Sequence, residues 1–314
     1  MRGRLSYAHP LLMKYFFLFS FILMSFLVNG QEDYKEKTAD SIRIRTFIYA
    51  DTLQMDLYDI LADTTSYKPT VILVHGGGFT TGQRNGGDER RLSTYLAKRG
   101  FNVASIDYRL SRKGKSFGCN CVTEIKLDTY IEAVADLSKA INHLTVNAKS
   151  FHVDASKILL MGSSAGAETV LNYLFMRYDY RFKHIPYPDA SVIGAVSLSG
   201  AVVDAGYISK ANKTPLLFFH GVNDIYVPYG TGPHHSCAIT ADGFLILDGP
   251  RAIADRLSIL GGSFKVYYNE NGGHEWSSYG YEYPERIAQF LEDALKGNTN
   301  MRDFEKIEIP VKNK

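Results

Sequence analysis

Apolar and polar positions follow two alternating patterns along most of the chain. Continuous apolar runs predict buried parallel strands covered on both faces, at residues 70–74, 101–106, 158–161, 192–198, 216–219 and 264–268. Between them lie segments with helical character, at residues 88–99, 123–146, 165–178, 250–260 and 283–295. Strands that alternate with helices in this way favour an α/β fold with a mostly parallel central sheet and helices on both faces.

A different pattern precedes these elements. Residues 41–50 and 54–61 alternate polar and apolar positions at their starts and predict an antiparallel hairpin at a sheet edge. The hairpin brings the expected sheet to about eight strands. We therefore expect a single domain over residues 40–296, followed by a polar C-terminal tail at 297–314.

The N-terminus has the character of an export signal. Three basic residues precede the uncharged run 15–28, which is shorter than the ~20 residues of a membrane span and fits a secretory apolar region of ~7–15. We expect cleavage after Gly30, a polar leader at 31–39, and a secreted or periplasmic protein that is not held at a membrane. An uncleaved signal anchor is the alternative, and translation could start at Met13 instead of Met1.

Charge gives no reason to expect a nucleic-acid or anionic-membrane partner. Removal of residues 1–30 takes away three basic residues and no acidic one, which changes the formal net charge from +2 to −1. A protein so close to neutrality has no broad basic surface for polyanions.

Three cysteines allow at most one disulfide. Cys119 and Cys121 are too close in sequence to pair with each other, so Cys237 is the expected partner of one of them; three free thiols are the alternative. This spacing is not that of a zinc site. His234 and His235 could bind a metal, but a surface loop is the favoured interpretation, and no metal is expected.

The strongest chemical motif is Gly-Ser-Ser-Ala-Gly at 162–166, directly after an apolar run. Gly-x-Ser-x-Gly at the end of a buried strand is typical of a nucleophile elbow, in which the central serine occupies a tight strand-to-helix turn. Ser164 is therefore the predicted nucleophile.

Two further residues fit a catalytic triad with this serine. His274 follows the last predicted strand in a glycine-rich loop and is the expected base; Asp224 follows an earlier strand and would orient the imidazole. Taken alone, each could be a surface or turn-capping residue. Their order, serine then acid then histidine, favours the triad, with Asp204 as the reserve acid.

The segment His75-Gly-Gly-Gly-Phe79 follows the first parallel strand. Its glycines would let backbone N–H groups face the site, so Gly77, Gly78 and Ala165 are the expected oxyanion donors. His75 is expected to hold this loop in place. The segment lacks the Lys and Ser/Thr of a phosphate-binding P-loop, and no dinucleotide fingerprint is present, so no cofactor is expected.

These motifs resemble those of the HGGG-type esterases and lipases of the α/β-hydrolase superfamily, over residues 54–295. The resemblance implies the α/β-hydrolase fold and hydrolysis of carboxylic esters through an acyl-enzyme. The chain is also similar to secreted bacterial esterases that remove acetyl or feruloyl groups from plant polysaccharides. Ser163 stands where many related lipases have aspartate, and no long N-terminal cap is evident; both features weaken a lipase assignment.

Aromatic residues near the motifs suggest a small-molecule or carbohydrate ester as the substrate. Phe79 and Trp276 are the expected substrate-binding side chains, whereas the aromatic segment 178–187 is interpreted mainly as a core-packing connection. Two other functions are considered: a peptidase of the same superfamily, and a non-catalytic binding module on a hydrolase scaffold.

Overall fold

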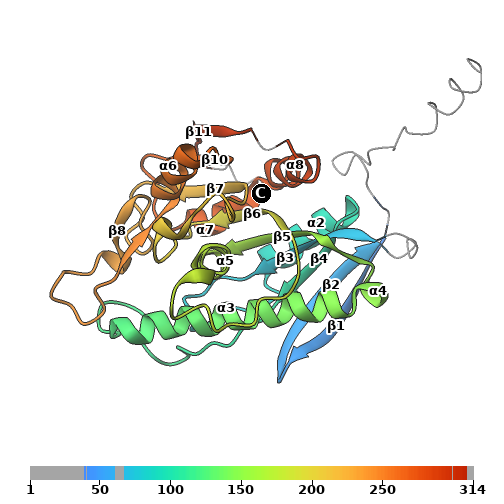
Figure 1. The fold of residues 1–314 in the computed structure, drawn as a ribbon, viewed down its shortest axis with the longest axis horizontal. Helices are drawn as coiled ribbons and strands as arrows, with labels where there is room; N and C mark the ends of the chain where they lie inside the picture. The colour runs from blue at the N-terminus through green and yellow to red at the C-terminus, as the bar shows by residue number, and fades with distance from the viewer. Residues whose placement is uncertain (1–38, 40, 61–66, 299, 310–314) are drawn as a thin grey trace, which may run out of the picture. The chain divides into compact units, whose positions relative to one another are not determined.

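The computed structural model describes residues 39, 41–60, 67–298 and 300–309 (Figure 1). The predicted signal peptide, and the predicted leader except for Ala39, lie outside these residues. Within the described ranges, no helix is both long and apolar enough to span a membrane.

A nine-stranded sheet forms the centre of the domain, in the order β1-β2-β4-β3-β5-β6-β7-β10-β11. Its strands are β1 (Ile42–Ala50), β2 (Leu53–Ile60), β3 (Lys68–Val74), β4 (Asn102–Ile106), β5 (Val153–Ser163), β6 (Val192–Leu198), β7 (Leu216–Gly221), β10 (Phe264–Asn269) and β11 (Arg302–Lys306). β1 and β2 form the predicted antiparallel hairpin, and from β4 to β11 all pairings are parallel. The predicted α/β fold with a mostly parallel sheet is confirmed.

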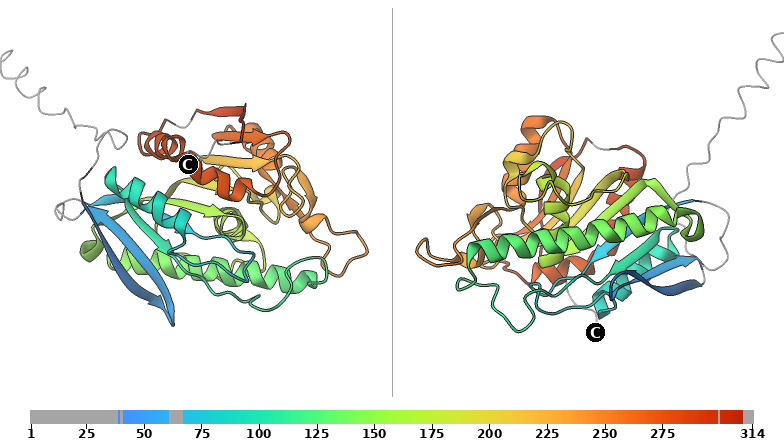
Figure 2. Two further views of the ribbon diagram at one scale, coloured as in Figure 1. Left: turned by 180° about the vertical axis from the view of Figure 1, so that it is seen from behind. Right: turned by 60° about the horizontal axis from the view of Figure 1, so that its bottom comes forward.

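Helices cover both faces of this sheet (Figures 1 and 2). One face carries α3 (Thr123–Val146), α5 (Ala165–Phe175) and α6 (Pro250–Leu260), whose buried side chains form one apolar core. The other carries α2 (Gly87–Lys98), α7 (Trp276–Tyr279) and α8 (Pro284–Leu295), which form a second core. Strand β5 is buried on both faces of the sheet, which explains why residues 158–161 of this strand form a continuous apolar run in the sequence.

The polar tail expected at 297–314 contains an element that we did not predict. Residues 302–306 form β11, which pairs in parallel with β10 at the edge of the sheet. Its sequence, Arg-Asp-Phe-Glu-Lys, is mostly charged, and it is linked to β10 by ion pairs from Lys265 to Asp303 and Glu305. Charged residues on an edge strand discourage pairing with other chains. They also leave the strand without the apolar run by which the other parallel strands were predicted.

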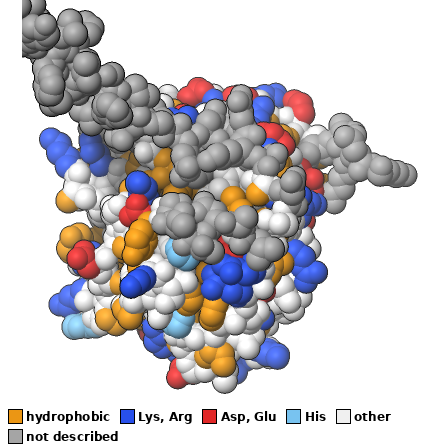
Figure 3. Space-filling model, turned by 90° about the vertical axis from the view of Figure 1, so that its right-hand side faces the viewer, with side chains coloured by type: hydrophobic (Ala, Val, Ile, Leu, Met, Phe, Trp, Pro, Cys, Tyr) orange, Lys and Arg blue, Asp and Glu red, His pale blue; other side chains and the backbone are white. Residues whose placement is uncertain are grey.

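Smaller elements complete the chain. They are α4 (Ala148–Phe151), the two-stranded sheet of β8 (Thr231–Pro233) and β9 (Ile246–Asp248), and short 3-10 turns that include η4 (His234–Ser236). On the face drawn in Figure 3, acidic and basic side chains of the described residues are interspersed. This mixture agrees with the near-neutral formal charge of the sequence.

The parallel register brings one set of strand ends together. β3, β5, β6, β7 and β10 lie next to one another in the sheet, with Val74 beside Gly162 and Tyr268 beside His220. The loops that follow β3, β5, β7 and β10 therefore meet at the carboxyl edge, where ligands of open α/β sheets bind.

Candidate active site

Ser164 occupies the turn between β5 and α5 with a φ of +50°. A non-glycine residue at positive φ is strained, and such strain is a feature of the nucleophile elbow. The two glycines of the motif make the turn possible: a Cβ at Gly162 would lie 2.3 Å from the carbonyl oxygen of Gly166, and one at Gly166 would lie 2.2 Å from that of Val74. The elbow therefore requires glycine at both positions.

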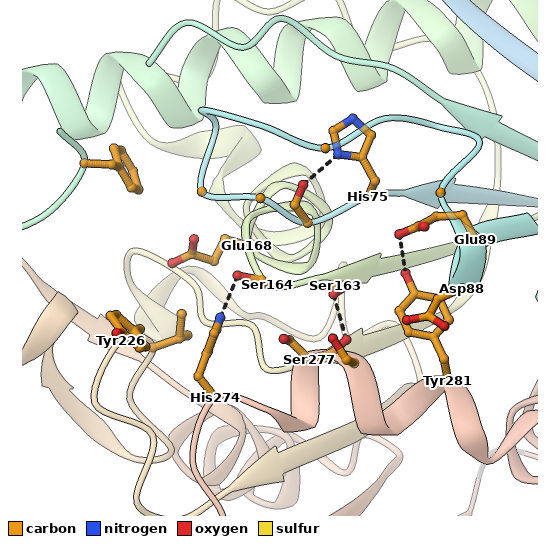
Figure 4. A pocket seen from close by; sticks show the side chains of 18 of the residues that line it. His75, Asp88, Glu89, Ser163, Ser164, Glu168, Tyr226, His274, Ser277 and Tyr281 are labelled. Carbon is orange, nitrogen blue, oxygen red and sulfur yellow. Dashed lines mark hydrogen bonds between the residues drawn. The ribbon is translucent and has the colours of Figure 1, made fainter. Parts of the chain in front are cut away.

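Figure 4 shows the Ser164 hydroxyl facing the imidazole of His274. Ser164 Oγ lies 2.8 Å from His274 Nε2, and His274 Nδ1 lies 2.7 Å from Asp224 Oδ2. The structure thus brings together the three residues expected to form the triad. The neighbouring Ser163 instead donates from its hydroxyl to the carbonyl of Ser277 at 2.8 Å.

The hydrogen bonds around Asp224 stabilise its ionised, carboxylate form. Burial alone would raise the pKa of Asp224, but hydrogen bonds from His220 and His274 outweigh it and hold the pKa well below its usual range. Its other oxygen, Oδ1, accepts the N–H groups of Tyr226 and Val227, each at 2.9 Å. A carboxylate fixed in this way keeps the His274 Nδ1–H directed toward it, which leaves Nε2 free to accept the serine proton.

The expected oxyanion donors lie in the loop after β3 and at the start of α5. Gly77 and Gly78 have φ values of +111° and +60° in the loop after β3, and Ala165 begins α5. In the part of the chain that the structure describes, no carbonyl oxygen accepts from the N–H of Gly77, Gly78 or Ala165. N–H groups without a carbonyl partner are what the predicted role as oxyanion donors requires.

His75 holds the glycine loop, as expected. Its ring stacks on Tyr108, with 4.5 Å between ring centroids, and Nδ1 donates to the Gly76 carbonyl at 2.7 Å. Burial lowers the pKa of His75, despite the hydrogen bond to Gly76, so the imidazole is neutral near pH 7.

A cavity of about 510 Å³ surrounds Ser164. On the Ser163 side, which we term the Glu89 arm, it is lined by polar side chains: Gln83, Asp88, Glu89, Ser277, Ser278 and Tyr281. On the opposite side, which we term the Glu168 arm, it is lined by Phe117, Glu168, Tyr226, Val227, His234 and His235. Figure 4 shows the carboxyls of Glu168 and Glu89 on the two sides of Ser164.

Phe79 is not placed at the substrate, contrary to expectation. It has a φ of +60° and a fully buried ring, in edge contact with Tyr108, Phe117 and Tyr130 at centroid distances of 4.8 to 5.9 Å. The backbone turn that brings Gly77 and Gly78 to the cavity wall directs the Phe79 side chain into the core. Phe117, in the same aromatic cluster, lines the cavity instead.

Trp276 is likewise fully buried, so the second expected substrate contact is also absent. Its ring stacks on Tyr283 under Gly272, where a Cβ would lie 2.2 Å from the indole nitrogen. Trp276 begins α7 and packs on the core, while Tyr281, five residues later, lines the cavity.

Glu168, His234 and His235 are among the cavity residues that were not predicted from the sequence. His234 and His235, expected on a surface loop, line the cavity, and His234 is buried. Glu168 was not singled out, although it lies four residues after Ser164 on α5 and therefore on the same helical face. Among the described residues, no group of three or more His, Cys, Asp or Glu side chains is arranged to hold a metal.

A disulfide joins Cys119 to Cys237, with Cα atoms 5.2 Å apart, and Cys121 is a buried free thiol. The bridge connects the loop that carries Phe117 to the loop that runs from Asp224 through His235. Both loops line the cavity, so the expected pairing with Cys237 is found and ties together two parts of the site.

Removal of this bridge should lower stability. Cys119→Ser is expected to destabilise the protein by about 2–4 kcal/mol, because the unfolded chain regains the freedom of a loop with a sequence separation of 118. Thermal unfolding should show the melting temperature of the parent protein, and of the control Cys121→Ala, falling on addition of a thiol reductant. The Cys119→Ser variant should already melt at the reduced value; a further fall with reductant would contradict the prediction.

The fold has close counterparts among solved structures. The chain superposes on esterase 2 of Thermogutta terrifontis phosphorylated by paraoxon with a TM-score of 0.57, over 82% of this chain and 95% of that one, at 16% identity. The butyrate-bound form gives the same score at 16% identity, over 83% of this chain and 96% of that one. The chain has the α/β-hydrolase fold.

Sequence comparisons find similarity between this chain and esterases. The BD-FAE family model matches residues 55–177, which include the elbow. A probable isoprenylcysteine alpha-carbonyl methylesterase of Oryza sativa subsp. japonica is 36% identical over 114 residues, 36% of this chain and 23% of that protein. The Arabidopsis thaliana enzyme is 32% identical over 125 residues, 39% of this chain and 25% of that protein. The chain thus aligns with about a quarter of the length of these curated relatives.

Proposed function

We propose that this α/β-hydrolase is an exported serine carboxylesterase acting on short-acyl or carbohydrate-linked esters. The observation that carries the proposal is the continuous path of hydrogen-bond distances from Ser164 Oγ through His274 to Asp224 at the wall of the cavity. The relationship to esterases supports the same reaction class.

The proposed reaction uses these groups in turn. His274 Nε2 takes the proton of Ser164 as Oγ attacks the ester carbonyl, and Asp224 stabilises the imidazolium. N–H groups of Gly77, Gly78 and Ala165 stabilise the oxyanion. The imidazolium then gives its proton to the departing alcohol, leaving an acyl-enzyme, and a water molecule activated by His274 releases the acid.

Four features support the proposed substrate and location. The Glu89 arm offers carboxyl, amide and hydroxyl groups, which suit the hydroxyls of a sugar alcohol component. The structural neighbour has been obtained with butyrate and with propionate bound, which supports a short acyl group. The disulfide and the apolar N-terminal run support export, because disulfides persist in oxidising compartments.

The test is a panel of p-nitrophenyl esters together with acetylated xylo-oligosaccharides. We expect a burst of p-nitrophenol from the acetate equal to the enzyme concentration, and kcat/KM at least about 10-fold lower for the octanoate than for the butyrate. Faster cleavage of a proline-containing peptide than of any ester would favour a peptidase. Failure to react with a fluorophosphonate probe would favour a binding module.

A further inference from the structure

Glu168 places a second ionisable group beside the nucleophile that the triad chemistry does not use. It lies one helical turn after Ser164, and its backbone N–H donates to the Ser164 carbonyl at 2.9 Å. Residues four apart share a face of a helix, so the carboxyl is directed into the cavity (Figure 4). The residue is 2% exposed, which is unusual for glutamate.

Only one oxygen of this carboxyl is engaged by the protein. Oε1 accepts the Tyr130 hydroxyl at 2.8 Å and lies 3.6 Å from His234 Nε2. Oε2 makes no hydrogen bond to the described residues, and it is not among the fully buried side-chain atoms that lack a partner. The oxygen therefore retains accessible surface and is open to a group that enters the cavity.

His234 lies beside Glu168 in the same wall of the cavity. It is buried, and within the described ranges its Nδ1 has no hydrogen-bond partner. Burial lowers the pKa of His234 well below its usual value, with the charges of His235 and Lys126 acting in the same direction. Phe117 packs edge-on against His234 at 5.2 Å and supplies the apolar part of this wall.

We propose that Glu168 and His234 form a hydrogen-bonding end wall of the Glu168 arm, which selects esters carrying an acceptor oxygen in this arm over hydrocarbon esters of the same length. The inference rests on the proposed esterase function and deepens it. Phe117 and Val227 would contact the carbon skeleton, while the end wall would bond an ether, carbonyl or hydroxyl oxygen. The apolar contacts alone would not distinguish the two kinds of ester, so the selection lies in the polar wall.

The charge state of Glu168 supports a donor at this wall. Burial raises the pKa of Glu168 to about 8, further raised by Asp224 and opposed by the Tyr130 hydrogen bond and by Lys126. The carboxyl is therefore neutral near pH 7. Because Tyr130 already donates to Oε1, the acid proton lies on Oε2 and can be donated into the cavity.

Charged or titratable groups from several elements face this carboxyl. They are Tyr108 after β4, Lys126 and Tyr130 on α3, His234 and His235 on η4, and Asp224 after β7. As pH rises through about 8, Glu168 loses its proton and the wall loses its donor. Selection for acceptor oxygens should therefore be present below that pH and fade above it.

The test uses two pairs of esters in which an ether oxygen replaces one methylene group. On the acyl side, p-nitrophenyl methoxyacetate is compared with the butyrate; on the alcohol side, 2-methoxyethyl acetate is compared with butyl acetate. The ratio of kcat/KM within a pair is measured for the parent protein and for Glu168→Leu, so that differences in intrinsic reactivity cancel. We expect the ratio to fall about 3–10-fold in Glu168→Leu for one pair, which identifies the half of the ester that enters this arm.

Glu168→Gln is the matched control, because its amide keeps a donor without an ionisable proton. We expect its ratio to stay near the parent value at pH 6.5 and to change little up to pH 9, whereas the parent ratio falls over that range. This pH series decides the matter even if Glu168→Leu does not fold. Unchanged ratios for both pairs in Glu168→Leu, or parent ratios for both pairs as flat with pH as those of Glu168→Gln, would overturn the inference while leaving esterase activity intact. Failure of the parent to hydrolyse any of the four esters would overturn the proposed function and this inference with it.

Discussion

Replacing Ser164 by alanine is expected to lower kcat for p-nitrophenyl acetate by about four to six orders of magnitude. The hydroxyl 2.8 Å from His274 Nε2 is the group positioned to attack the ester carbonyl. The substitution removes that oxygen and leaves the turn, the glycine loop and Asp224 in place. The residual rate would come from the oxyanion donors and from substrate positioning alone.

Ser163→Ala is the matched control for this experiment. Its hydroxyl donates to the Ser277 carbonyl and not to the imidazole, so its loss should cost at most about 10-fold in activity. Melting temperatures of both variants should stay close to that of the parent protein, which separates loss of chemistry from loss of fold. A Ser164→Ala protein that is folded and turns over at the parent rate would refute the assignment of the nucleophile.

The three expected triad residues could be placed together from the sequence because each lies in the loop or turn that follows an apolar run. A parallel sheet places the ends of such runs at one edge, so chain order and local pattern were enough to bring Ser164, Asp224 and His274 together. Gly77 and Gly78, the expected oxyanion donors, could be placed at the same edge for the same reason, since they lie in the loop that follows β3.

The substrate-binding residues could not be located in this way. Phe79 is one residue beyond the oxyanion loop and Trp276 two beyond His274, yet both side chains point into the interior. Proximity in sequence to a catalytic residue does not decide which way a side chain points at a positive-φ turn or at the first residue of a helix. His234 lines the cavity because of the course of the long segment after β7, and no local sequence pattern predicts that course.

The sequence also could not decide which of Cys119 and Cys121 pairs with Cys237. Cys119 and Cys121 are two residues apart, and either could have approached Cys237. The turn between them directs Cys119 to the bridge and buries Cys121 against the core. Similarly, β11 has a single apolar residue, Phe304, and is held at the sheet edge by backbone pairing and ion pairs instead of by an apolar run.

Asp224→Asn is expected to lower kcat by about 10⁴-fold while leaving the fold intact. The asparagine carbonyl can still accept the N–H groups of Tyr226 and Val227, which hold the loop. Its NH₂ group would then face His274 Nδ1, where the carboxylate now accepts. A donor in that place favours the tautomer with the proton on Nε2, and that nitrogen can no longer accept the serine proton.

Asp204→Asn separates this effect from that of the reserve acid. Asp204 accepts the N–H of Gly206 at 2.7 Å and caps a short turn, and it does not line the cavity, so its variant should retain nearly full activity. Steady-state rates with p-nitrophenyl acetate, measured beside near-identical melting curves for the two variants, give the comparison. The opposite result, with Asp204→Asn inactive and Asp224→Asn active, would assign the orienting role to Asp204. Because the Asp224 carboxylate is held ionised by His220 and His274, its contribution should persist throughout the pH range in which the enzyme is folded.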